Sequence, residues 1–225
     1  MKKRYRKRFI IGLAMLFLSL LQAIYARFTP YFPGDVQVTR FVQGFNSRFL
    51  ISVMETISRG FTGLPAVLLA VVFVMVIWWR LGIRAAAFMA GAAVLSPVDD
   101  VLKFLIHRPR PPAILVNIIM PASGLSFPSG YAFFATMTLG MMTYFIIKYV
   151  TNRKIKIVLT AGLIISILLV GFSRVYLGAH WGSDVVESYF IAGGLVLLLS
   201  VFYEQILLDR TGRSKTGLLK TKAGK

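Results

Sequence analysis

The chain has 225 residues, 57% of them hydrophobic, and several apolar runs of about twenty residues that a soluble domain of this length would not carry. The absence of cysteine excludes disulfides, thiolate catalysis and cysteine-based metal sites, and two histidines argue against a histidine-rich metal site. The net charge of +18 lies mostly in the tails and in alternate loops, which membrane orientation explains, so we expect no nucleic-acid partner.

Residues 1–8 form a basic tail, and an apolar run follows from Phe9 to about Ala26. A basic start before an apolar run also describes a secretory signal peptide. This run is long for a signal peptide, and its Ile24-Tyr25-Ala26 end lacks small residues at both cleavage positions. The pattern predicts an uncleaved first transmembrane helix after a cytoplasmic tail.

Residues 27–60 are predicted to form an outer-face loop that contains an amphipathic helix. Turn-forming residues come first, at Thr29-Pro30 and Pro33-Gly34. Between Val38 and Ile57 apolar residues recur at helical spacing, with polar and charged residues largely between them. Such a helix lies on the membrane surface or packs on a helix bundle, and the pattern fits both arrangements.

Two further spans are predicted at residues 61–79 and 85–106. Small residues open the third span and allow close contact with a neighbouring helix. The same span carries Asp99, Asp100 and Lys103. Burying charged side chains in a membrane-spanning helix costs free energy, so their presence indicates a functional site. We expect the two aspartates to pair with Lys103 or with another helix.

A loop rich in Pro and Arg covers residues 107–128, and three spans follow it. They are predicted at residues 129–150, 157–171 and 181–208, with a basic tail at residues 209–225. The sequence therefore predicts an all-α, polytopic membrane protein. It consists of one membrane domain, residues 1–225, with six transmembrane helices in a bundle.

Six spans place both termini on one side of the membrane. That side receives 18 of the 26 Lys and Arg residues, and the other side receives 8. Cytoplasmic loops carry the excess of positive charge, so both tails are predicted to be cytoplasmic. We expect a multi-pass protein of the plasma or inner membrane whose opposite face meets the periplasm or the exterior.

Three unusual stretches, at residues 103–111, 126–131 and 173–184, fall at the outer ends of helices. Ser129-Gly130 opens the fourth span, whose backbone amides can bind an anion, although a serine there also suits a helix cap. A bundle that gathers these stretches would form a pocket suited to phosphate. The cations of that pocket would be Lys103, Arg108, Arg110 and Arg174.

His180 is the candidate nucleophile in this pocket. Asp184 follows one helical turn later and can hold the imidazole in one tautomer. Attack at phosphorus would give a phosphohistidine. No metal ligand set and no cofactor motif accompany these residues, so cations and amides are expected to stabilise the transition state.

The motifs Lys103-x6-Arg110-Pro111, Pro128-Ser129-Gly130 and Ser173-Arg174-x5-His180-x3-Asp184 occur in this order. Together they resemble the three-part pattern of the type 2 phosphatidic acid phosphatase superfamily, which includes bacterial membrane lipid phosphatases and is related to vanadium haloperoxidases. The resemblance covers residues 99–193, the predicted catalytic core. Residues 1–60 match only as a membrane-embedded lead.

The resemblance implies roles for the motif residues. His180 attacks phosphorus and Asp184 aligns it, while the phosphate is bound by Lys103, Arg110, Ser129, Gly130 and Arg174. It also implies a metal-independent enzyme that acts on lipid phosphates at the outer face of the membrane, in agreement with the topology expected from the charges.

Tyr131 departs from the family pattern, in which a histidine that protonates the leaving oxygen follows the Pro-Ser-Gly triplet. Tyrosine has an ordinary pKa of about 10 against about 6.5 for histidine, so it is the poorer acid near neutral pH. Three outcomes are open: a diphosphate substrate that needs little protonation, proton donation by Tyr131 or another acid such as His107, or phosphate binding with little turnover. His107 is more simply explained as a loop residue.

The leading hypothesis is an integral-membrane phosphatase of lipid phosphates or diphosphates. The substrate classes are prenyl diphosphates, phosphatidic acid and phosphatidylglycerophosphate. The alternatives are a lipid phosphotransferase that uses the same phosphohistidine, and a low-turnover protein that binds lipid phosphate. No pattern in the sequence indicates an oligomeric state.

Overall fold

The computed structural model describes residues 3–222, and the side chains of residues 5–207. Over this part the chain forms nine α-helices and no strand, which confirms the predicted all-α class. The helices are α1 Lys3–Phe28, α2 Asp35–Gln43, α3 Arg48–Gly60, α4 Gly63–Leu81, α5 Ile83–Val94, α6 Val98–Ile106, α7 Gly130–Tyr149, α8 Arg153–Tyr176 and α9 Gly182–Lys222.

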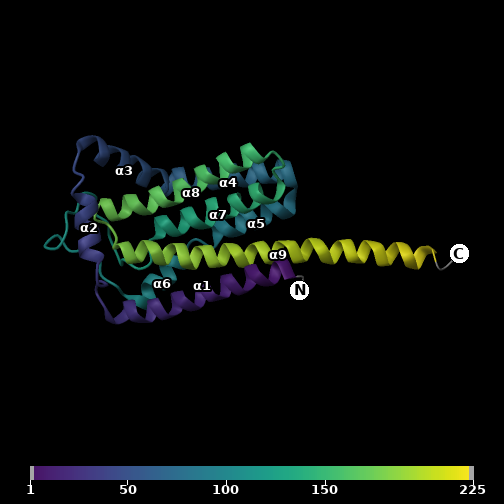
Figure 1. The fold of residues 1–225 in the computed structure, drawn as a ribbon, viewed down its shortest axis with the longest axis horizontal. Coiled ribbons are helices and arrows are strands. Elements are labelled where there is room, and N and C mark those ends of the chain that lie inside the picture. The colour runs from purple at the N-terminus through teal and green to yellow at the C-terminus, as the bar shows by residue number, and fades with distance from the viewer. Residues whose placement is uncertain (1–2, 223–225) are drawn as a thin grey trace.

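Six membrane-spanning segments are confirmed by helix length and apolar composition within the described residues. They are Tyr5–Phe28, Gly63–Leu81, Ile83–Ile106, Gly130–Tyr149, Arg153–Tyr176 and Gly182–Leu207. In Figure 1 these helices run side by side, and α2 lies across one end of the bundle. Both chain ends lie at the opposite end. The side of the membrane that each end faces stays a prediction, and residues 1–2 and 223–225 of the predicted tails lie outside the described residues.

The bundle packs around α9, which contacts α1, α5, α7 and α8 (Figure 1). Glycines allow the closest of these crossings. A Cβ atom added at Gly12 of α1 would lie 3.1 Å from the carbonyl oxygen of Gly194 on α9. Small residues at such a crossing let two backbones approach, which is how membrane helices associate without a hydrophobic driving force between them.

The third predicted span is not one continuous helix. It divides into α5 and α6 at residues 95–97, just before the first turn of α6. Pro97 has no backbone N–H, and its ring would clash with the carbonyl group one turn earlier, so the α5 helix cannot continue through it. The charged residues of this span therefore belong to a short separate helix, α6.

The fifth predicted span is longer than expected at both ends. Asn152 caps α8, because its side chain accepts hydrogen bonds from the amides of Lys154 at 3.0 Å and Ile155 at 3.2 Å. The cap starts the helix inside the basic segment that we expected to be a loop. At the other end α8 continues to Tyr176, so Arg174 lies in the last turn of the helix.

Residues 27–60 form two helices instead of the single helix expected over residues 38–57. The chain leaves α2 at Gly44, and Ser47 starts α3 by accepting a hydrogen bond of 3.1 Å from the amide of Leu50. Both helices pack on the bundle, α3 against α8 and α2 against α8 and α9, and a position on the membrane surface stays a prediction. The helix α2 buries polar side chains, while Phe41 is 70% exposed.

Candidate active site

The three unusual stretches meet at the end of the bundle where α2 lies. They border a pocket of about 480 Å³ between the start of α4, the break between α5 and α6, and the start of α7. Apolar residues form part of its wall, including Phe61 just after α3, Val67 of α4 and Phe134 of α7. Its polar lining includes Asp99, Asp100, Lys103, Arg110, Gly130, Tyr131 and His180.

His180 occupies the turn between α8 and α9 and is 1% exposed. Its Nδ1 atom lies 2.7 Å from the backbone oxygen of Ser126 and 3.7 Å from Oδ2 of Asp184. The carbonyl can only accept, so the proton sits on Nδ1 and Nε2 keeps its lone pair. Asp184 therefore acts on the ring through its charge, at a distance beyond a direct hydrogen bond.

The Nε2 atom of His180 faces Arg110, whose Nη1 atom lies 3.0 Å away. The same Arg110 atom donates to the backbone oxygen of Ala179 at 2.7 Å. Burial, with a smaller effect of the charge of Arg110, lowers the pKa of His180 to about 4 against the opposing effect of Asp184. The imidazole is thus neutral and nucleophilic at physiological pH, and a cation stands beside its reactive atom.

This lowered pKa predicts the acid limit of the activity. If His180 is the nucleophile, only its neutral imidazole can attack phosphorus, so kcat/KM is expected to hold as the pH falls below the ordinary histidine pKa of about 6.5 and to decline only near the pKa of about 4. The measurement is kcat/KM over the acid range, corrected for ionisation of the substrate phosphate. An acid limb at about 6.5 would contradict the buried, neutral imidazole.

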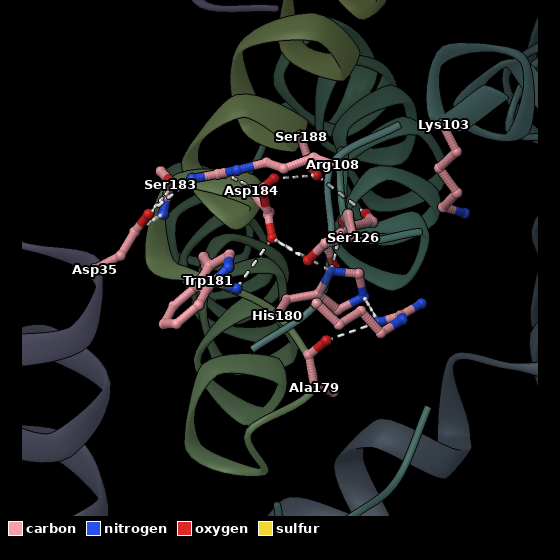
Figure 2. A network of polar contacts seen from close by, with 12 residues as sticks. Asp35, Lys103, Arg108, Ser126, Ala179, His180, Trp181, Ser183, Asp184 and Ser188 are labelled. Atoms are coloured by element: carbon pink, nitrogen blue, oxygen red, sulfur yellow. Dashed lines mark hydrogen bonds and ion pairs between the residues drawn. The ribbon is translucent and has the colours of Figure 1, made fainter. Parts of the chain in front are cut away.

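Asp184 is fully enclosed and is held by three donors. Its Oδ2 atom accepts from the Ser126 hydroxyl at 2.5 Å and from the Trp181 amide at 3.0 Å (Figure 2). Its Oδ1 atom accepts from Nη1 of Arg108 at 2.5 Å. Arg108 is 1% exposed and is not among the residues that line the pocket. The expectation that Arg108 belongs to the phosphate pocket is therefore wrong, because its guanidinium is committed to carboxylates.

Lys103 lines the pocket and stands apart from the Asp184 network in Figure 2. Its Nζ atom pairs with Asp99 at very short range and with Oδ1 of Asp100 at 3.0 Å, as the spacing on α6 predicts. The pairing holds the ammonium group beside the start of α7, where an anion would be bound.

Gly130 is required by this arrangement. A Cβ atom at this position would lie 2.4 Å from Oδ2 of Asp99 and 3.2 Å from Nζ of Lys103. We expect Gly130→Ala to displace both side chains and to raise KM for a lipid phosphate by about fivefold, a modest loss of positioning, with a smaller change in kcat. Steady-state kinetics in detergent measure both constants, and an unchanged KM would contradict this reason for the glycine.

Arg174 and Tyr131 form a stacked pair behind the pocket. The guanidinium carbon of Arg174 lies 3.9 Å from the centroid of the Tyr131 ring. Arg174 also donates to the Ser58 hydroxyl of α3, and its Nε atom has no hydrogen-bond partner in the described part of the chain. Tyr131 lines the pocket together with His180, whereas Arg174 does not.

Ser129 and His107 take no direct part in the pocket lining. Ser129 is buried, and its hydroxyl neither caps α7 nor finds another hydrogen-bond partner within the described residues. His107 ends α6 with a positive φ of 56° and is exposed, with its ring near that of Phe104. The simpler interpretation of His107 as a loop residue fits this position.

Sequence reasoning missed three polar residues that touch the centre. Ser126 holds both His180 and Asp184, and its place just before the Pro-Ser-Gly triplet was the one available signal. Asp35 and Ser183 pair with Arg108. The sequence around Asp35 predicts a turn, and no pattern in it predicts a buried carboxylate.

The arrangement offers a neutral imidazole, two nearby cations and helix amides to a phosphate group. Such groups stabilise a phosphoryl transition state by charge and position. Among the described residues, no group of three or more His, Asp or Glu side chains is placed to hold a metal ion.

Comparison with known proteins relates residues 81–207 to the PAP2 superfamily. Phosphatidylglycerophosphatase B of Bacillus subtilis (strain 168) is 36% identical over 113 residues, which is 48% of this chain and 53% of that protein. Dolichyldiphosphatase 1 of Callithrix jacchus is 28% identical over 158 residues, 66% of this chain and 64% of that protein. The matched segments thus span from about half to just under two thirds of these relatives.

Two solved structures share the fold. A transmembrane PAP2-type phosphatidylglycerolphosphate phosphatase from Bacillus subtilis has a TM-score of 0.75 at 23% identity, covering 87% of this chain and 96% of that one. Aquifex aeolicus LpxE has a TM-score of 0.59 at 20% identity, covering 77% of this chain and 96% of that one. The helical fold and the family match agree with the resemblance that the three motifs indicate. This chain therefore belongs to the PAP2 superfamily, the type 2 phosphatidic acid phosphatases.

Proposed function

We propose that the protein is an integral-membrane phosphatase that removes phosphate from lipid phosphates or diphosphates. The observation that carries the proposal is the buried, neutral His180, whose Nε2 atom lies 3.0 Å from Arg110 in the same pocket as Lys103. A nucleophile beside fixed cations suits phosphorus chemistry. The named activities of the relatives, a phosphatidylglycerophosphatase and a dolichyldiphosphatase, support the same class of reaction.

In the proposed reaction the phosphate binds between Arg110, Lys103 and the amide of Gly130. The Nε2 atom of His180 attacks phosphorus, the bond from phosphorus to the leaving oxygen breaks, and phosphohistidine forms. The Nδ1 proton stays on the ring, hydrogen-bonded to Ser126, while the charge of Asp184 stabilises the cationic imidazole. Water then attacks phosphorus, the bond to Nε2 breaks, and inorganic phosphate leaves.

The first step requires a proton for an alkoxide leaving group. Tyr131 lines the pocket and is the candidate donor, in a place where the family pattern has a histidine. A lipid diphosphate expels a phosphate, which is far less basic and needs little protonation. We therefore propose that prenyl diphosphates are turned over better than monoesters such as phosphatidic acid and phosphatidylglycerophosphate.

The proposed site faces the periplasm or the exterior. The pocket is lined by the start of α7 and by His180 of the turn between α8 and α9. In Figure 1 these segments lie toward the end of the bundle opposite both termini, and the excess of Lys and Arg on the terminal side supports a cytoplasmic location for the tails.

The test is phosphate release in detergent from prenyl diphosphate, phosphatidic acid and phosphatidylglycerophosphate, with His180→Ala as the control. We expect release from at least one substrate, fastest from the diphosphate. Equal rates for wild type and His180→Ala on every substrate would refute the phosphatase. Labelled phosphate transferred to an added lipid would instead identify a phosphotransferase, and binding that needs Arg110 and Arg174 without turnover would identify a binding protein.

A further inference from the structure

Asp35 is a buried carboxylate that lies outside the family match and yet reaches the active site. It begins α2 and is 5% exposed. Its Oδ2 atom accepts from the amide of Phe32 at 2.7 Å, from Nη2 of Arg108 at 2.9 Å and from the hydroxyl of Ser183 at 2.7 Å. Its Oδ1 atom accepts from the amide of Ser183 at 3.0 Å. Every hydrogen-bond partner of this carboxylate among the described residues is a donor, an arrangement suited to a carboxylate anion.

Arg108 connects Asp35 to the catalytic centre, as Figure 2 shows. Its Nη2 atom pairs with Asp35 at 2.9 Å, and its Nη1 atom pairs with Asp184 at 2.5 Å. The Ser183 hydroxyl at 2.8 Å from Nη1 and the Pro30 carbonyl at 3.2 Å from Nε occupy further donors. The side chain of Arg108 is 0% exposed, so both pairs lie away from water. Each of the three guanidinium nitrogens of Arg108 thus has a partner outside the pocket, and Arg108 is not among the residues that line the pocket.

The resulting chain of charges alternates in sign. Asp35 is negative, Arg108 positive and Asp184 negative, and the imidazole of His180 becomes positive when Nε2 attacks phosphorus. At low dielectric each charge strongly affects its neighbours. Arg108 alone would draw Asp184 away from the imidazole and weaken its stabilising effect, and Asp35 balances that pull.

We propose that Asp35 is a positioning residue that acts through Arg108 to fix Asp184 and thereby to support the positive charge on His180. The inference rests on the proposed function, because it assigns a role in the same reaction. It predicts an effect on kcat with little effect on KM, since Asp35 touches none of the residues that line the pocket.

Four charged or titratable groups surround His180 and influence its pKa or its pocket. They are Arg110 and Asp184 in contact, with Arg174 close enough to act on its pKa and Tyr131 in the same pocket lining. Removing the charge of Asp35 leaves Arg108 less balanced and makes the imidazole harder to protonate. The acid limb of kcat/KM is therefore expected to move to lower pH in Asp35→Asn.

Gln43 provides the matched control for simple docking of α2. It also lies on the buried face of α2 and is 7% exposed. Its Nε2 atom donates to the backbone oxygens of Asn117 at 2.7 Å and Tyr176 at 3.0 Å, and its Oε1 atom accepts from the amide of Asn117. It therefore anchors α2 through neutral hydrogen bonds, and its hydrogen-bond partners in the described part of the chain are Asn117 and Tyr176 rather than Arg108, Asp184 or His180.

The experiment is a double-mutant cycle with Asp35→Asn and Arg108→Gln, with thermal unfolding measured on every variant. We expect Asp35→Asn to lower kcat by about tenfold with KM unchanged, which is the size of effect typical of a group that orients a catalytic residue. In the Arg108→Gln background the same change is expected to cost less than about twofold. Gln43→Ala is expected to lower the unfolding temperature and to leave kcat and the acid limb unchanged.

Equal losses from Asp35→Asn in both backgrounds would overturn the proposal, as would a kcat and an acid limb unchanged by the substitution. If Gln43→Ala lowered kcat as much as Asp35→Asn does, at the same unfolding temperature, Asp35 would serve only to dock α2 on the bundle. The cycle is repeated on the Kd for orthovanadate, a phosphate analogue that adopts the five-coordinate geometry of phosphoryl transfer. Inactive wild type would refute the proposed function, and coupling in vanadate binding would then still decide the role of Asp35.

Discussion

Replacing His180 by alanine is expected to lower phosphate release from the preferred lipid substrate by at least about 10⁴-fold, as is typical when a covalent nucleophile is removed. The imidazole is the one histidine side chain that lines the pocket, and its Nε2 atom is the group that Arg110 faces. Lys103, Arg110 and the start of α7 remain in the variant, so substrate binding is expected to persist while turnover is lost.

His107→Ala is the matched control for this prediction. His107 is the only other histidine of the chain, it is exposed, and it does not line the pocket. Rapid acid-free quenching of wild type with labelled substrate is expected to trap an acid-labile phosphoprotein, retained in His107→Ala and absent in His180→Ala. A trapped phosphoprotein in His180→Ala, or its loss in His107→Ala, would place the nucleophile elsewhere.

Tyr131→His is expected to raise the hydrolysis of lipid monophosphates by at least about tenfold, and by no more than the roughly 10²–10⁴-fold typical of general acid catalysis. A histidine at this position would stand in the same pocket as His180 and would supply a proton to an alkoxide leaving group. The hydrolysis of a diphosphate is expected to change little, because phosphate leaves without help. The ratio of the two kcat/KM values, measured on one preparation, reports the effect independently of the active fraction.

Tyr131→Phe separates the hydroxyl from the ring. Phenylalanine keeps the aromatic face on which Arg174 stacks at 3.9 Å and removes only the proton donor. A slower monoester reaction in Tyr131→Phe identifies the tyrosine as the natural acid, and an unchanged rate shows that it donates nothing. If Tyr131→His leaves monoesters unaffected, position 131 is not where the leaving oxygen lies.

The six spans were predictable because apolar length is a local property of the chain, and each span was found. The exact places where helices break or begin were not predictable, because they depend on single residues. Pro97 ends continuity in the third span, while Asn152 starts α8 within a basic segment that resembles a loop. The inward-facing polar side of α2 also eluded prediction, because its partners lie in α9 and in the loop after α6, far along the chain.

The site was predictable where spacing within a motif implies a shared surface. Lys103, Arg110, Gly130, Tyr131 and His180 do line one pocket. Spacing does not reveal what a side chain faces, and Arg108, two residues from Arg110, turns to Asp35 and Asp184 instead. The buried carboxylates of Asp35 and Asp184 need a cationic partner, and their burial is known only from the three-dimensional structure.

The wall that α4 contributes to the pocket has a consequence for how the enzyme would meet its substrate. Val67 lines the pocket and is 58% exposed on a membrane-spanning helix, so we expect the pocket to border the hydrocarbon of the bilayer. A substrate can keep its chains among neighbouring lipids while only its phosphate enters. Its encounter with the enzyme is then two-dimensional, and the half-saturating amount of substrate is a mole fraction in the membrane or micelle. Added inert detergent would slow the reaction by surface dilution at constant bulk concentration.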